Sequence, residues 1–264
     1  MEVSSLAKAI AVFNQKGGVG KTTTNVNLSA ALAAQNKKVL VIDNDPQGNS
    51  TSGLGIDKNA IEFNIYDALI DQVDVSKCII PTPYKNLDII PSDVQLAGAE
   101  VEMIDLEHRE VRLKRIIDEV RDKYDYIMVD CPPSLGLLTI NSLVAVDSVI
   151  IPIQCEYYAL EGVSQLINTY QLIRKSLNPN LEIEGVLLTM YDSRTNLSNL
   201  VVEEVKKHFK ERVYTTVIPK NVRVAEAPSY GMPVIAYDSK SKGAIAYVKL
   251  AKEVHKRSIG GKNK

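Results

Sequence analysis

Two lysines, three glycines and two threonines fall within eight residues near the start of the chain, KGGVGKTT at 16–23. Glycines let a turn curl so that successive backbone N–H groups point at one anion. Lys21 is suited to the β- and γ-phosphates of a nucleotide, and the Thr22 hydroxyl is suited to Mg²⁺. The stretch therefore predicts a phosphate-binding loop, and it leaves open what the first lysine, Lys16, does.

The residues on either side favour this interpretation. The apolar run at 8–14 predicts a buried strand, and the sequence from Thr22 onward has helical periodicity. A glycine-rich turn between a strand and a helix N-terminus is typical of phosphate loops, because the helix dipole adds positive partial charge there. The literal pattern G-x-x-x-x-G-K-[ST] is not met, since Gln15 stands where its first glycine would be. A glycine-rich turn that binds nothing is the alternative.

Three aspartates at the ends of apolar runs decide against that alternative. KKVLVIDNDPQGN, residues 37–49, delivers Asp43 and Asp45 at alternate positions, and YDYIMVDCPPS, residues 124–134, delivers Asp130. Strand periodicity puts the first two on one side, at the carboxyl end where α/β sheets bind ligands. An aspartate at a strand tip is typical of a residue that holds Mg²⁺ through water. One such residue could be a helix cap, but three beside a glycine loop indicate a nucleotide site.

Four stretches give the chain a specific resemblance. NQKGGVGKTTTNVNL, VIDNDPQGNSTSGLG, DYIMVDCPPSLG and IPKNVRVAEAPSYGMPVIAYD resemble the ParA/Soj chromosome- and plasmid-partitioning ATPases, within the MinD/ParA superfamily that carries a deviant Walker A motif. The first stretch marks the superfamily, whereas DPQGN and the IPKNVRVAEAPS block are more particular to ParA/Soj. The resemblance runs from about residue 8 to about residue 255 and implies a P-loop NTPase fold.

The resemblance also implies roles for individual residues. Lys16 is the signature lysine, which reaches across an ATP-sandwich homodimer to the phosphates held by the other subunit, much as an arginine finger does. Asp45 positions the attacking water, and Asp43 and Asp130 support Mg²⁺ through water. The position between the first two aspartates is often apolar in the family, and here it is Asn44. The expected ATP-binding residues are Lys16, Gly17, Gly18, Val19, Gly20, Lys21, Thr22, Thr23 and, at the adenine, Pro219 and Asn221.

The spacing of the elements predicts one α/β domain over residues 1–264, with a short basic tail from about 258. Helical patterns at 159–176, 196–210 and 243–257 alternate with apolar runs. Such alternation is typical of a doubly wound, mostly parallel sheet of about seven or eight strands flanked by helices. The predicted strands are 8–14, 38–43, 87–91, 125–130, 148–153, 183–190, 214–218 and 233–237.

Composition limits the possible partners and compartment. No apolar run reaches transmembrane length and no signal peptide is recognisable, which predicts a cytoplasmic protein. Three dispersed cysteines suit a reducing compartment.

The segment 191–264 carries 15 Lys and Arg against 7 Asp and Glu, although the whole chain has a net charge of −1. A basic segment of this kind fits DNA contact. Arg194 and Arg223 match the family's DNA-contacting arginines, and Lys206, Lys207, Lys240 and Lys242 could widen the patch; Arg194 could instead pair with Asp192.

Three functions compete. The first is a slow ATPase that acts as a partition switch, binds DNA nonspecifically as an ATP dimer on the nucleoid, and is reset by a ParB/Spo0J-type partner. The second is a MinD-like membrane-associated switch, but the tail SIGGKNK from Ser258 offers one isoleucine and no apolar face. The third is a metabolic or redox enzyme such as the nitrogenase iron protein or a cobyrinate-type amidoligase, for which no cysteine pattern or amidoligase constellation is apparent. The sequence favours the first, with no membrane partner.

Overall fold

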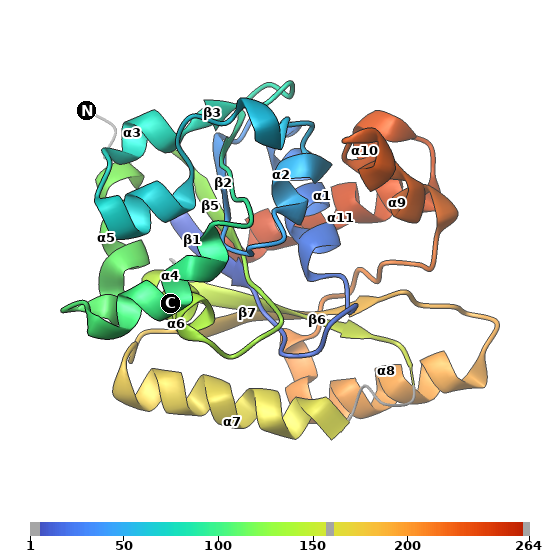
Figure 1. Cartoon of the computed structure of the whole chain (residues 1–264). Helices are drawn as coiled ribbons and strands as arrows, with labels where there is room; N and C mark the ends of the chain where they lie inside the picture. The colour runs from blue at the N-terminus through green and yellow to red at the C-terminus, as the bar shows by residue number, and fades with distance from the viewer. Residues whose placement is uncertain (1–5, 157–160, 261–264) are drawn as a thin grey trace.

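The computed structural model describes residues 6–156 and 161–260, which form a seven-stranded sheet flanked by helices (Figure 1). The spatial order is β3-β4-β2-β5-β1-β6-β7, and every pairing is parallel except β3 with β4. The strands are β1 (Lys8–Val12), β2 (Val39–Asp43), β3 (Ile80–Pro81), β4 (Leu87–Ile90), β5 (Tyr126–Asp130), β6 (Ser148–Gln154) and β7 (Glu182–Thr189). The predicted doubly wound P-loop architecture is confirmed.

Helices cover both faces of the sheet. They are α1 (Lys21–Ala33), α2 (Asn49–Gly53), α3 (Val75–Cys78), α4 (Leu96–Glu102), α5 (Arg112–Val120), α6 (Leu137–Ala145), α7 (Glu161–Ser176), α8 (Asn196–Phe209), α9 (Val222–Glu226), α10 (Val234–Tyr237) and α11 (Lys242–Gly260), with short 3₁₀ turns and one π-helical turn at Asp67–Asp71. In Figure 1, α7 and α8 lie along one face. Within the described ranges, no helix combines the length and apolar composition needed to cross a bilayer.

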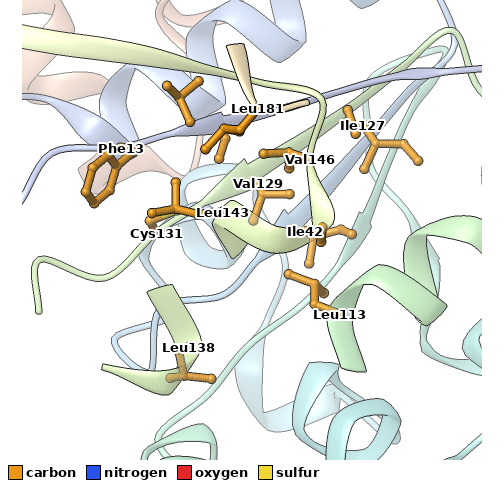
Figure 2. Packing of buried hydrophobic residues seen from close by; sticks show 14 of the residues in the cluster. Phe13, Ile42, Leu113, Ile127, Val129, Cys131, Leu138, Leu143, Val146 and Leu181 are labelled. Atoms are coloured by element: carbon orange, nitrogen blue, oxygen red, sulfur yellow. The ribbon is translucent and has the colours of Figure 1, made fainter. Parts of the chain in front are cut away.

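The two cores follow the alternation of side chains along the strands. Ala9 and Ala11 of β1 belong to the cluster under α5, α6, α7 and α8, part of which is drawn in Figure 2. Ile10 and Val12 belong to the opposite cluster, with α1 and α11. Successive strand residues point to opposite faces, so a strand covered on both sides is apolar throughout. This explains why the strand runs in the sequence are continuous rather than alternating.

Two predicted strands are not strands. Residues 214–218 run beside β7, where the N–H of Tyr214 donates to the Val186 carbonyl at 2.9 Å, but only isolated bridges form. Residues 233–237 instead contain the helical turn α10. Pro233 precedes it with φ −65°, which is the fixed proline value that suits a helix start, and Val234 is buried against α1 and α11. The apolar composition was right for burial and wrong for the type of element.

The remaining differences concern boundaries. The short antiparallel strand β3 was not predicted. Helix α11 runs to Gly260, three residues beyond the predicted end at 257, so the start of the predicted basic tail is helical. The last part of that tail, 261–264, lies outside the described residues, as does the beginning of the helix predicted at 159–176.

Candidate active site

The three central strands bring the predicted groups to one edge of the sheet. Strand β5 lies between β1 and β2, and Asp130 is in register with Val12 on one side and with Asp43 on the other. The glycine loop that follows β1 therefore lies at the same edge as the two aspartates. Carboxyl ends of parallel strands are where α/β proteins bind ligands.

The glycine loop leads directly into α1. Gly20 is the N-cap residue with φ 90°, a left-handed conformation that glycine adopts without strain, and α1 begins at Lys21. The carbonyl of Val19 accepts a hydrogen bond at 2.9 Å from the Thr189 hydroxyl at the end of β7. The Asn14 carboxamide accepts from the N–H of Lys16 at 3.0 Å. These contacts hold the loop at Lys16 and at Val19.

The two lysines of the loop have different surroundings. Lys21 is 7% exposed, and its Nζ donates to the Lys16 carbonyl at 3.0 Å. Burial lowers the pKa of Lys21, and the nearby carboxylate of Asp130 opposes the shift. The side chain of Lys16 is exposed and, among the described residues, is in no ion pair. Lys21 is therefore buried at the edge that carries the aspartates, whereas the side chain of Lys16 is exposed to solvent.

Hydroxyl groups of α2 hold the two strand-end carboxylates. The hydroxyl of Thr51 donates to Asp43 at 2.7 Å, and its N–H donates to the same oxygen at 2.8 Å. The hydroxyl of Ser50 donates to Oδ2 of Asp130 at 2.8 Å. Burial raises the pKa of both carboxyls, and for Asp130 the neighbouring charge of Asp43 adds to the increase.

The surroundings of the Asp130 carboxylate indicate whether Mg²⁺ fits this site. Its Oδ1 is buried and has no hydrogen-bond partner among the described residues. A buried carboxylate oxygen without a partner is costly, and water bound to a metal would satisfy it. The donor set also fits a hard cation: the Thr22 hydroxyl lies beside Asp130, and Asp43 is in register with Asp130 on the neighbouring strand. The predicted metal residues therefore lie together with chemistry suited to Mg²⁺.

Asp45 lies just beyond the end of β2. It is 6% exposed, and its Oδ1 accepts from the N–H of Gln47 at 2.9 Å. Its backbone carbonyl accepts from the Ser92 hydroxyl at 2.9 Å, which connects it to the chain after β4. Asp45 is thus held at the same edge as Lys21 and Asp130.

Four hydroxyl-bearing residues at this edge were missed in the sequence: Ser50, Thr51, Ser92 and Thr189. Only the first two adjoin a motif, in the stretch NDPQGNST, and that position was a usable signal. The others are distant in the sequence and carry no pattern of their own.

The predicted adenine residues lie at the end of β7. Pro219 pairs with Tyr191 in an isolated bridge, which brings its turn to the edge of the sheet. Asn221 caps α9, because its side-chain oxygen accepts from the N–H of Val224 at 3.3 Å. The turn is therefore near the Thr189 contact with the glycine loop, but the adenine role of both residues stays a prediction.

The predicted DNA residues fall into three places. Arg194, 86% exposed, pairs with Asp192 at 2.7 Å, the local pairing considered as its alternative. Arg223 pairs with Glu226 at 2.9 Å and with Asp238 at 3.5 Å, which brings it near the segment holding Lys240 and Lys242. Lys206 and Lys207 lie in the last turn of α8, about 15 Å along the helix from its start near Arg194. Lys207 pairs with Glu204. The chain thus brings Arg223, Lys240 and Lys242 together and separates Lys206 and Lys207 from Arg194.

Comparisons with known proteins identify the family. Residues 7–183 match a family described as an AAA domain. The sporulation initiation inhibitor protein Soj of Bacillus subtilis is 62% identical over 249 residues, covering 94% of this chain and 98% of that protein. The chromosome partitioning protein ParA of Myxococcus xanthus is 50% identical, covering 96% of this chain and 90% of that protein.

Solved structures share the fold. Cobyrinic acid a,c-diamide synthase from Mycobacterium smegmatis with bound ADP and magnesium has a TM-score of 0.86 and 36% identity, covering 97% of each chain. The septum site-determining protein MinD from Pyrococcus horikoshii, complexed with Mg-ADP, has a TM-score of 0.80 and 27% identity, covering 94% of this chain and 96% of that one. Both alternatives weighed from the sequence thus have relatives of this fold, but at much lower identity than Soj and ParA. The chain belongs to the ParA/Soj family of chromosome-partitioning ATPases.

Proposed function

We propose that this protein is an ATP-driven switch in DNA partitioning. It binds ATP and Mg²⁺, hydrolyses ATP slowly to ADP and phosphate, and binds DNA nonspecifically as an ATP-bound homodimer in the cytoplasm, on the nucleoid. A ParB/Spo0J-type centromere-binding protein resets it by stimulating hydrolysis. The observation that carries the proposal is the pair of lysines in one loop, with Lys21 buried beside the carboxylates and Lys16 exposed to solvent.

The residues of one subunit divide the chemistry among them. The Gly17–Thr23 backbone and Lys21 bind the phosphates and neutralise charge on them. Thr22, Asp43 and Asp130 would hold Mg²⁺, Thr22 through its hydroxyl and the two aspartates through water. The metal, when bound, polarises the phosphates and neutralises charge that develops on them. Asp45 orients the water that attacks the γ-phosphorus, while Pro219 and Asn221 bind the adenine.

Two features of the described residues support the proposal that a second subunit completes the ATP site. The first is Lys16, whose cationic end has no carboxylate partner among the described residues. The second is exposed apolar side chains on segments that adjoin the site: Val94, two residues after Ser92, is 77% exposed, and Leu135, in the loop after Asp130, is 46% exposed. Large apolar side chains left in water at one edge are typical of an interface. A dimer that shares ATP would cover this edge and couple nucleotide occupancy to assembly.

Lys16→Ala tests the proposal. We expect the variant to bind ATP as a monomer, because Lys21 and the loop backbone are intact, but to lose the ATP-dependent dimer and at least about 90% of hydrolysis, as for a trans-acting cation. Sedimentation velocity with and without Mg-ATP measures the dimer, and nucleotide titration measures binding. Lys85→Ala is the matched control, because it also removes an exposed lysine but lies 69 positions after Lys16 and outside the glycine loop. A full-strength dimer in Lys16→Ala would show that Lys16 is an ordinary solvated loop residue.

A further inference from the structure

Asn44 is the residue of the nucleotide edge that the proposed chemistry does not use. It lies between Asp43 and Asp45 and is completely buried. Its side-chain Nδ2 donates to two groups of α6, the Leu138 carbonyl and the Ser142 hydroxyl, each at 2.8 Å. Its backbone N–H donates to the Asp130 carbonyl at 3.1 Å. One residue therefore connects the segments that follow β2 and β5.

The helix that Asn44 holds is itself well anchored. Asn141 of α6 donates to the Arg109 carbonyl at 2.8 Å and accepts from the N–H of Leu113 at 3.2 Å. At the other end, Asn178 donates to the carbonyls of Leu143 and Val146, each at 3.0 Å. Because α6 is tied to neighbouring elements along its length, a hydrogen bond to it places Asn44 against a rigid support.

Stability alone does not explain an amide at this position. The Oδ1 of Asn44 is buried, and among the described residues it has no hydrogen-bond partner. An unpaired buried acceptor costs free energy, and an apolar side chain of the same shape would avoid that cost. A buried polar side chain that adds little or nothing to the stability of the fold is better explained by the groups that it holds in position.

We propose that Asn44 is a positioning residue that holds Asp45 in place for the attacking water. Asp45 is the next residue along the chain, and its carbonyl is held from the opposite side by the Ser92 hydroxyl at 2.9 Å. The backbone at 44–45 is thus fixed between α6 and the chain after β4. The inference rests on the proposed function, because it takes Asp45 as the residue that orients the water.

The first test is Asn44→Leu, which keeps the shape of the side chain and removes both donated hydrogen bonds. We expect kcat for ATP hydrolysis to fall by about tenfold, since small displacements of a positioning group cost that much or more. The KM for ATP should stay within about twofold, because no phosphate contact changes. The thermal midpoint should be unchanged or higher, because the unpaired Oδ1 is removed. Ser142→Ala, which deletes one of the two acceptors, should give a smaller loss of kcat in the same direction.

The second test places Asn44→Leu in an Asp45→Ala background. If Asn44 acts through Asp45, the double variant should hydrolyse ATP at the rate of Asp45→Ala alone. A further loss in the double variant would overturn the inference, as would an unchanged kcat in Asn44→Leu, or a fall in kcat accompanied by a lower thermal midpoint and a raised KM. Wild-type hydrolysis by Asp45→Ala itself is a different result, because it would refute the role of Asp45 in the proposed function.

Discussion

At the scale of single residues, the site concentrates charge that the protein alone does not balance. Asp43 and Asp130 are both 0% exposed and lie in register on neighbouring strands. Burial and the neighbouring charge of Asp43 raise the pKa of Asp130, and the hydroxyl groups of Thr22 and Ser50 offset only part of this increase. The protein is therefore less stable than it would be with uncharged residues at these positions, as expected where groups are arranged to bind a ligand.

Asp130→Asn should separate stability from function. The amide removes a buried charge but keeps an oxygen that can accept from Ser50, so we expect the nucleotide-free protein to gain on the order of 2 kcal/mol in its free energy of unfolding. The same change should abolish the extra stabilisation of the protein that Mg²⁺ gives when ADP or ATP is also present. Urea denaturation in EDTA, and then with nucleotide and Mg²⁺, measures both effects. A less stable variant without ligand would contradict the argument.

The pH dependence of the wild-type protein has a definite sign. A carboxyl whose pKa is raised in the folded state binds its proton more tightly there than in the unfolded chain. The contribution of Asp43 and Asp130 to stability in EDTA is therefore greatest at low pH and decreases as the pH rises from about 4 toward neutrality. In Asp130→Asn this decrease should be smaller.

At the scale of elements, the turn between β2 and α2 sets the geometry of the carboxylates. Gly48 has φ +58°, and a Cβ there would lie 2.5 Å from the Ser92 carbonyl oxygen. The turn carries the chain directly into α2, whose Ser50 and Thr51 bond to the aspartates. Only glycine combines this left-handed conformation with so close an approach of backbone to backbone.

Gly48→Ala should lower the free energy of unfolding by about 2 kcal/mol, through backbone strain and displacement of the chain at Ser92. Urea denaturation of the nucleotide-free protein measures it. Gly17→Ala is the matched control, because its φ is not in the left-handed region and nothing lies within 4 Å of its added Cβ. The control should keep wild-type stability yet weaken ATP binding, because the loop backbone must approach the phosphates. Equal stability losses in the two variants would show that the Ser92 contact is unimportant.

At the scale of the whole molecule, the proposed DNA binding depends on the basic C-terminal segment. Arg194 and Arg223 are in ion pairs, but their side chains are 86% and 52% exposed. Exposed pairs contribute little, so a phosphate can replace the carboxylate. One subunit presents few cations, and two sets in an ATP dimer would bind more tightly through avidity.

Arg194→Ala and Arg223→Ala should each weaken binding to random duplex DNA by about three- to tenfold at moderate salt, independently of sequence. The slope of log affinity against log salt concentration should become shallower by the amount expected for about one lost phosphate contact per subunit. ATP-dependent dimerisation should survive. Fluorescence anisotropy over a salt series with Mg-ATP measures the effect, with Lys38→Ala, just before β2, as control. Wild-type affinity in the Arg194→Ala, Arg223→Ala double variant would refute this footprint, and absence of DNA binding by the wild-type dimer would refute the partition function.

The sequence by itself determined the fold class and the family, and it predicted the residues that meet at the nucleotide edge. Lys21, Thr22 and the three aspartates each belong to a short motif that joins a strand to its ligand loop, and β1, β2 and β5 could be recognised because strands buried on both faces are continuously apolar. Local composition was less decisive at 233–237, where burial of Val234 and the conformation of Pro233 favour a helical turn over a strand.

Only the tertiary structure decided what surrounds those motifs. The hydrogen bond from Ser50 to Asp130 joins residues separated by 80 positions, and that from Asn44 to Leu138 joins residues separated by 94. The contact between Thr189 and Val19 spans 170 positions. None of these has a pattern along the chain, because the partners meet through the order of strands in the sheet rather than through spacing in the sequence. The motif residues could thus be predicted one by one, whereas the groups that hold them in position became visible only when the strands were placed side by side.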